Sequence, residues 1–182
     1  MQKTKLGMFY GTGSGTAKAT IGAEVGQIVC ARMAYTSAAA GTLVIYRPDI
    51  AARANAAVSA SATLVIKTDA TGYVEGYTPT TSDYVLVGNS TTSGTTWYLQ
   101  SISSVAGVSS STRSLGLGGN IYCAADDFVF ICKAANLVSI TTGTETVNQI
   151  YDAFVGFKNM PVHVLLTATG TDMVSGKYEV WD

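Results

Sequence analysis

The residues of this chain that could do chemistry are few and are scattered along the sequence. His163 is the only histidine, and it lies inside the apolar run 162–166. A Ser-His-Asp site would instead place its histidine at a strand end or loop, with the serine on a Gly-x-Ser-x-Gly turn, and no such turn is present. We therefore expect His163 to be a hydrogen-bonded core or interface residue. The sequence predicts a protein that is not an enzyme and has no catalytic residue.

The acidic residues and the cysteines also favour structural roles. Asp126 and Asp127 are adjacent, and neighbours on a strand point to opposite faces, so they cannot act as paired carboxylates. We expect one of them to begin a strand and to bond within the preceding turn, as Asp83 would. The three cysteines form no Cys-x-x-Cys pair, which predicts buried thiols and neither a disulfide nor a zinc site. We expect no metal and no cofactor.

The first 26 residues differ from the rest of the chain. Glycines are frequent in residues 11–15, but the order that follows lacks the Gly-Lys-Ser/Thr ending of a phosphate-binding loop and the third glycine of a dinucleotide motif. With few apolar residues, this segment cannot bury a core of its own. We interpret residues 1–26 as a flexible, extended N-terminal arm and residues 27–182 as a single β domain.

Short apolar runs dominate the remainder of the chain. They are rich in β-branched and aromatic residues, end in small polar residues, and comprise residues 43–46, 64–66, 84–87, 128–131 and 162–166. Runs this short predict strands, and both faces of each strand are apolar. Such strands need two covers, either two layers of the same fold or another subunit. The sequence predicts an all-β protein, an antiparallel β-sandwich or barrel-like domain with at most one or two short helices.

Two segments leave their secondary structure open. Residues 50–62 are rich in alanine and could form a short surface helix, although their serine and asparagine residues weaken it. Residues 147–157 place apolar side chains at helical spacing but would fit a bulged strand nearly as well. Two segments also share a pattern: Asp83 and Asp127 each precede an aromatic residue, a valine and further apolar residues, and each run is followed by Leu-x-x-Ile. We interpret this pattern as one β-hairpin used twice.

Composition points to partners made of protein. The chain has 182 residues, of which 47% are hydrophobic and 13% charged, with a formal net charge of −1. So few charges protect a monomer poorly against association, which favours a homo-oligomer whose neighbours shield the apolar strands. The cationic residues are scattered, so we expect no direct nucleic-acid partner. No apolar stretch is long enough to cross a bilayer, so we expect no membrane partner, and residues 1–10 lack the apolar region of a signal peptide.

The chain resembles virion structural proteins of tailed bacteriophages, in particular the small capsid decoration, or cement, proteins. The resemblance lies in the charge-poor texture rich in Gly, Ser, Thr and Ala, in the strand starts Asp-Tyr-Val-Leu-Val at residue 83 and Asp-Asp-Phe-Val-Phe at residue 126, and in the Gly-rich segment before the β domain. The family has no catalytic residues to carry over.

The resemblance implies a β protein made in the cytoplasm of the host bacterium and located on the capsid surface of the virion. It would bind the major capsid protein from outside, as a homotrimer, and stabilise contacts between neighbouring capsid subunits. Our candidates for capsid or subunit contacts are basic and aromatic residues, namely Lys3, Lys5, Phe9, Tyr10, Trp97, Tyr98 and Trp181.

Two alternatives stay open at this point. Within the structural class, a tail-tube, neck or fibre component would also need extended loops and two interface faces. In another class, a carbohydrate-binding module could be built around an exposed Trp97 or Tyr98, since aromatic rings also stack on sugars.

Overall fold

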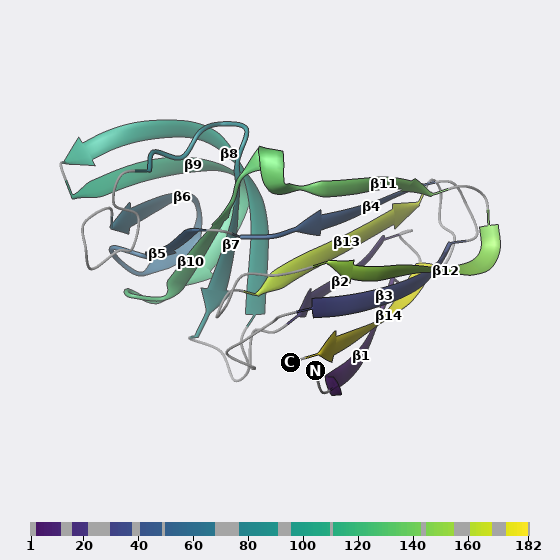
Figure 1. The fold of residues 1–182 in the computed structure, drawn as a ribbon. Helices are drawn as coiled ribbons and strands as arrows, with labels where there is room; N and C mark the ends of the chain where they lie inside the picture. The colour runs from purple at the N-terminus through teal and green to yellow at the C-terminus, as the bar shows by residue number, and fades with distance from the viewer. Residues whose placement is uncertain are drawn as a thin grey trace. The chain divides into compact units, whose positions relative to one another are not determined.

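The computed structural model describes residues 3–11, 16–21, 30–37, 41–48, 50–67, 77–90, 96–109, 111–142, 145–154, 161–168 and 174–181. The chain divides into two compact units, residues 1–47 with 137–182, and residues 48–136. Both consist of antiparallel strands (Figure 1). In the described residues the only helix is the single 3-10 turn η1, Ala134–Asn136. The predicted all-β fold is confirmed.

The first unit is a sandwich of two four-stranded sheets, with strand orders β1-β14-β3-β12 and β11-β4-β13-β2. Its strands are β1 (Lys3–Gly11), β2 (Thr16–Ile21), β3 (Cys30–Ser37), β4 (Gly41–Tyr46), β11 (Val138–Thr142), β12 (Glu145–Phe154), β13 (Val162–Ala168) and β14 (Val174–Trp181). The sheets contact each other through β1, β2, β13 and β14.

One long hairpin, rolled up, generates this strand order. β4 pairs with β11, β3 with β12, β2 with β13 and β1 with β14, all antiparallel. Rolling the hairpin then pairs β13 with β4 and β14 with β3. Strands β1 to β4 alternate between the two sheets, and so do β11 to β14. This is the jelly-roll topology. We call residues 1–47 and 137–182 the jelly-roll unit.

The second unit is inserted at the tip of that hairpin, between β4 and β11. Its six strands are β5 (Ile50–Arg53), β6 (Val58–Lys67), β7 (Tyr84–Asn89), β8 (Thr96–Ser109), β9 (Thr112–Cys123) and β10 (Phe128–Cys132), in the order β5-β10-β7-β8-β9-β6. The sheet curls until its two edge strands meet: Ala54 bridges Ile66, and Asn55 N donates to Val65 O at 2.8 Å. We call residues 48–136 the barrel unit.

The core of the barrel unit lies inside the curled sheet. Alternate residues of every strand point inward, as the two-residue period of a β-strand requires. The fully buried set comprises Ala52, Ala54, Leu64, Ile66, Val85, Val87, Ile102, Leu115, Leu117, Ile121, Cys123, Val129 and Ile131. Each strand of the barrel contributes to this cluster, so the core depends on closure of the whole sheet.

Two turns of the barrel unit share one hydrogen-bond pattern. Thr80 N donates to Asp83 Oδ2 at 2.8 Å, and Asp83 N donates back to Thr80 O at 3.1 Å. Ala124 N donates to Asp127 Oδ2 at 2.7 Å, and Asp127 N donates back to Ala124 O at 3.4 Å. Each aspartate comes directly before a strand, β7 or β10. The prediction that these aspartates begin strands and bond within the preceding turns is confirmed.

Each aspartate also binds the chain just beyond the other strand. Asp83 Oδ1 accepts a hydrogen bond from Ala134 N at 3.3 Å, after the end of β10. Asp127 accepts bonds from Ser90 N at 3.1 Å and from Ser90 Oγ at 2.5 Å, after the end of β7. Because β7 and β10 pair antiparallel, the two contacts are related by a local twofold axis. We call them the aspartate clasps.

The same axis relates the strands that flank β7 and β10. Ala54 N, directly after β5, donates to Asp127 O at 3.0 Å. Ile102 N, in β8, donates to Asp83 O at the same distance. Because Asp127 corresponds to Asp83, Ala54 corresponds to Ile102, and β5 corresponds to the start of β8.

The equivalence extends to the remaining two strands. Ala54 bridges Ile66 of β6, and its counterpart Ile102 pairs with Leu117 of β9. β6 therefore corresponds to β9. The barrel unit consists of two three-stranded repeats, β5-β6-β7 and β8-β9-β10, that close one barrel together.

This repeat differs from the predicted one. β7 and β8 do form the first hairpin, with Tyr84 opposite Ser101. The second predicted hairpin is wrong, because β10 pairs with β5 and β7 while β11 belongs to the jelly-roll unit. The shared pattern marks the last strand of each repeat. The pairing of β7 with β10 could not be predicted from the sequence, because β8 and β9 separate these two strands along the chain.

Further predictions need correction or qualification. Residues 50–62 contain β5 and the first half of β6, so the short helix is wrong. Alanine suits this barrel because Ala52 and Ala54 are fully buried inside it. The ambiguous segment 147–157 is a strand, β12, as far as Phe154, with two register irregularities. Residues 155–157 lie outside the described residues.

The unit boundaries also differ from the predicted arm and single domain. The predicted arm 1–26 contains β1 and β2, which belong to one sheet each of the jelly-roll unit. Deleting residues 1–26 would therefore remove a strand from both sheets. The boundaries of the inserted barrel unit could not be predicted from the sequence, because the amino-acid composition does not change between β4 and β11.

The doubly apolar strands are covered by the chain itself. In β7, residues 85–88 are all buried, and in β10, residues 129–132 are all buried. Among the described residues the large hydrophobic side chains exposed to solvent are Tyr122 and Phe128. The inference that neighbouring subunits must shield these strands is therefore wrong for β7 and β10, because their side chains on both faces are already buried within the one chain.

Ala60 should be replaced by glycine with a gain in stability. Its φ of 50° is left-handed and lies at the β6 bulge between Val58 and Ser61. An alanine there costs about 1 kcal/mol, more than the entropy that glycine loses on folding. We expect Ala60→Gly to raise the free energy of unfolding by roughly 0.5 kcal/mol.

Urea unfolding measures this change. Ala57→Gly is the matched control, because Ala57 is equally exposed but has no positive φ; it should lower the free energy of unfolding by about 0.5–1 kcal/mol. Two variants that shift stability in the same direction would contradict the prediction.

Candidate interaction surface

Five of the seven predicted contact residues come together in the jelly-roll unit. Lys3, Lys5, Phe9 and Tyr10 lie on β1, an edge strand, and Trp181 lies on its neighbour β14. Lys3 is paired with Trp181 in the strand register, although the two residues lie near opposite ends of the sequence. The structure describes their backbone only, so their roles as contacts stay predictions.

The other two predicted contact residues, Trp97 and Tyr98, serve packing. Trp97 on β8 is half-buried, lies opposite Gly88 of β7, and its ring centroid is 6.0 Å from that of Phe130 on β10. Tyr98 packs against the barrel core, with its ring 6.1 Å from that of Tyr122. A bulky ring opposite a glycine fills the space that the missing side chain leaves. Neither ring stands free as a platform for a ligand.

Trp97→Ala tests this packing role. Truncating a fully buried tryptophan to alanine would lower the free energy of unfolding by about 3–5 kcal/mol. Because Trp97 is half-buried, we expect its truncation to lower this free energy by about 2–3 kcal/mol. Chemical denaturation followed by circular dichroism measures it. Tyr122→Ala is the control, since Tyr122 is 43% exposed and should lose less. A Trp97→Ala loss no greater than that of Tyr122→Ala would contradict the packing role.

The most exposed large hydrophobic residue of the described chain lies at another place. Phe128, the first residue of β10, is 44% exposed. Its register partner on β5 is Arg53, so both side chains point to the same, outer face. The Arg53 guanidinium carbon lies 3.5 Å from the centroid of the Phe128 ring. On the same strand the Phe130 ring is nearly parallel, at 5.6 Å between centroids.

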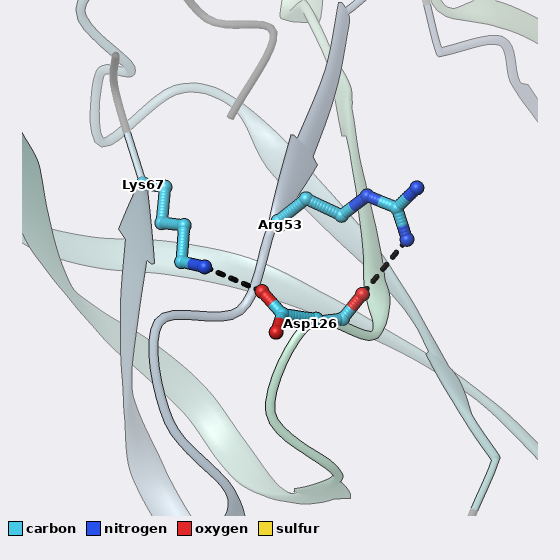
Figure 2. Close-up of polar contacts among 3 residues, drawn as sticks. All are labelled: Arg53, Lys67 and Asp126. Carbon is cyan, nitrogen blue, oxygen red and sulfur yellow. Dashed lines mark hydrogen bonds and ion pairs between the residues drawn. The ribbon is translucent and has the colours of Figure 1, made fainter. Parts of the chain in front are cut away.

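Asp126 fixes this arrangement from the turn before β10 (Figure 2). Its φ of 64° is left-handed, a conformation that aspartate tolerates better than most residues. Its carboxylate accepts a hydrogen bond from Lys67 Nζ at 2.5 Å, and its backbone carbonyl accepts one from the Arg53 guanidinium at 2.8 Å. The bond from Lys67 lowers the pKa of Asp126. We call Arg53, Lys67, Asp126 and Phe128 the Arg53–Phe128 corner.

The twofold repeat supplies a counterpart for this corner. Phe128 and Arg53 are paired in one repeat as Tyr84 and Ser101 are in the other. Lys67 follows Ile66 as Gly118 follows Leu117, and Asp126 precedes one clasp aspartate as Ser82 precedes the other. The corner's members thus correspond to Ser101, Gly118, Ser82 and Tyr84. The equivalent positions of the other repeat carry none of these charges, so closure of the barrel does not require them. The two turns differ in detail, because Asp126 has a left-handed φ and Ser82 does not.

Sequence reasoning missed this corner. Arg53 and Phe128 are far apart in the sequence and neither stands in a recognisable motif. Only an alignment of the two repeats could have singled them out, and that alignment depends on knowing the strand register.

Asp83 is the most enclosed acidic group of the described residues. It is 5% exposed, and besides the clasp bonds it accepts a bond from the Tyr77 hydroxyl at 2.5 Å. Burial acts to raise the pKa of Asp83, but the hydrogen bonds from Tyr77, Thr80 and Ala134 outweigh it and hold the pKa below its usual value. The carboxylate is therefore a structural anion that holds the entry to β7.

Asp83→Asn should destabilise the protein in a pH-dependent way. An amide loses part of the acceptor capacity, which we expect to cost about 1–3 kcal/mol in the free energy of unfolding at neutral pH. Because the folded-state pKa is lowered, the wild-type advantage is complete above the ordinary aspartate value, near 4, and is lost as the pH falls through the folded-state pKa.

Urea unfolding at a series of pH values from 7 downward measures this advantage. Asp127→Asn, at the equivalent and less buried clasp, provides the matched comparison and should lose less stability. An Asp83→Asn deficit that grows as the pH falls would contradict the assignment.

The histidine and two cysteines behave as predicted. His163 on β13 is 4% exposed, its Nδ1 is 2.9 Å from Thr20 Oγ1 of β2, and its ring lies near Tyr46. This confirms a hydrogen-bonded core histidine. Cys123 and Cys132 are buried free thiols, and burial raises the pKa of Cys123. The side chain of the third cysteine, Cys30, lies outside the described ones.

The described positions offer neither a metal-binding cluster nor a membrane-spanning helix. No group of three or more His, Cys, Asp or Glu residues among them could hold a metal ion. No helix formed by these residues is long and apolar enough to cross a membrane.

Comparison of the sequence with models of known protein families found no match, and comparison with curated proteins found none either.

Proposed function

We propose that this chain is a non-enzymatic virion structural protein of a tailed bacteriophage, a decoration protein on the outer surface of the capsid. It would bind the major capsid protein and stabilise contacts between neighbouring capsid subunits. Homotrimers, which the sequence resemblance implies, are part of the proposal. Its location would be the capsid surface, after synthesis in the cytoplasm of the host.

The observation that carries the proposal is the jelly-roll unit with a second β unit inserted at its hairpin tip. Jelly rolls are common in viral capsid and lectin domains. This support is an analogy of architecture, joined to the charge-poor composition of the chain. The doubly apolar strands add no support, since their own chain buries them.

Two other functions fit parts of the same architecture. A tail-tube, neck or fibre component would use the same rigid β units and is distinguished by open polymers instead of closed trimers. A carbohydrate-binding module is favoured by the occurrence of jelly rolls in lectins, although Trp97 is half-buried and packs against Phe130. Light scattering on the purified protein distinguishes a polymerising tail component from a closed trimer. Binding to a glycan array would identify a carbohydrate-binding module.

Cryo-electron microscopy of the parent particle tests the proposal. The decoration role predicts density for both β units on the outside of the shell, contacting more than one capsid subunit. Shells that lack the protein should rupture at a lower temperature, and adding the purified protein should restore them, because the added contacts must be broken first. Density in the tail, or in no part of the particle, would rule the decoration role out.

A further inference from the structure

We infer that the Arg53–Phe128 corner is a docking site for a protein partner that offers an Asp or Glu carboxylate beside an apolar side chain. This inference does not depend on the capsid role. Three observations carry it: the departure of the corner from the twofold repeat, the charge of Arg53, and the exposed ring of Phe128.

The repeat acts as an internal control for what folding requires. The two aspartate clasps keep the same hydrogen bonds in both repeats, so the fold preserves what it needs. At the corner, by contrast, Arg53 corresponds to Ser101 and Phe128 to Tyr84. A guanidinium and an exposed phenyl ring in one repeat only are a departure that the barrel itself does not explain.

Arg53 attracts the Asp126 carboxylate electrostatically but makes no side-chain hydrogen bond to it, so its guanidinium is suited to an external anion. The Asp126 carboxylate pairs with Lys67, and Arg53 bonds to the backbone carbonyl of Asp126, as Figure 2 shows. This carbonyl bond and the Phe128 ring hold the guanidinium in place. Since a planar guanidinium can bind a carboxylate through two parallel hydrogen bonds, and this one is already oriented, little side-chain entropy is lost on binding.

The geometry favours a protein over a sugar or a nucleic acid. A sugar stacks on a free ring face, but Arg53 already covers one face of the Phe128 ring at 3.5 Å. A nucleic acid requires several cations along a groove, and here Lys67 is already paired with Asp126. An arginine beside an exposed aromatic ring is typical of the few residues that dominate protein–protein binding.

A peptide array probes the corner with the purified full-length protein. Matched peptides centred on Leu-Asp-Leu and Leu-Asn-Leu, and on the corresponding Glu and Gln sequences, differ only in the carboxylate. We expect the wild type to prefer the carboxylate peptides and to lose that preference as salt concentration rises. Arg53→Ser should weaken this binding roughly tenfold, the effect of one dominant contact.

Three further variants make the result decisive. Arg113→Ser removes the same charge from another place in the barrel unit, where Arg113 bonds only backbone carbonyls of Ser109 and Thr112, and should bind like the wild type. Arg53→Lys keeps the charge but not the planar fork and should bind at an intermediate level. Phe128→Ala removes the exposed ring, and the loss of this contact should also weaken binding.

Arg53→Ser should fold, because serine occupies the equivalent position of the other repeat, and its thermal unfolding confirms this in the same preparation. The inference is overturned if the wild type binds the Asp and Asn peptides alike, or if Arg53→Ser binds no worse than Arg113→Ser. Loss of binding to an acidic glycan in Arg53→Ser, without any carboxylate preference on the peptides, would assign the corner to a sugar and overturn it too.

Discussion

The antiparallel pairing of β4 with β11 is the constraint on which the rest of the structure depends. Val138 lies opposite Ile45, and the pairing continues to Gly41 and Thr142. Once these strands are side by side, β3 meets β12, β2 meets β13 and β1 meets β14, so one contact fixes the register of the whole jelly-roll unit. The same pairing brings the two ends of the barrel unit together. An insertion with adjacent ends can be accommodated there without disturbing the sandwich.

The barrel unit solves the problem of closure by repetition. Three strands cannot bury a core alone, but two copies related by a twofold axis supply six strands and a common interior. The aspartate clasps are central to this arrangement, because each carboxylate joins the start of its own strand to the end of the other repeat's strand. Loss of either clasp therefore affects both repeats.

The same repetition allows equivalent positions of the two repeats to be compared with each other. Buried positions such as Ala54 and Ile102 serve the core even where their residue types differ, whereas exposed positions that differ in charge, such as Arg53 and Ser101, are under no such packing requirement. Arg53, with its guanidinium over Phe128, stands among the differing positions. Trp97, which lies opposite Gly88 and packs against Phe130, shows another case: an aromatic residue that is prominent in the sequence and yet serves packing on the sheet. Aromatic content alone does not separate these two roles, whereas exposure and register do.

Much of the local structure could be predicted from the residue pattern. Short apolar runs determine strands, because they are too short for stable helices and are bounded by small polar residues. The Asp-aromatic-Val pattern at Asp83 and Asp127 determines two turns that open strands, since an aspartate carboxylate bonds nearby backbone N–H groups wherever such a turn forms. The lone buried His163 and the unpaired cysteines Cys123 and Cys132 are likewise determined by composition and context.

Partner strands were decided only by the tertiary structure. β4 and β11 are separated by a complete barrel unit, and β7 meets β10 across two strands, so no local pattern encodes either pairing. Residues 50–62 became strands because a narrow barrel needs small inward side chains, which overrides the helix propensity of alanine. Arg53 and Phe128 form a site only because two distant strands are in register. Sequence sets which backbone conformations are favourable locally, whereas contacts between distant residues depend on the closure of whole sheets.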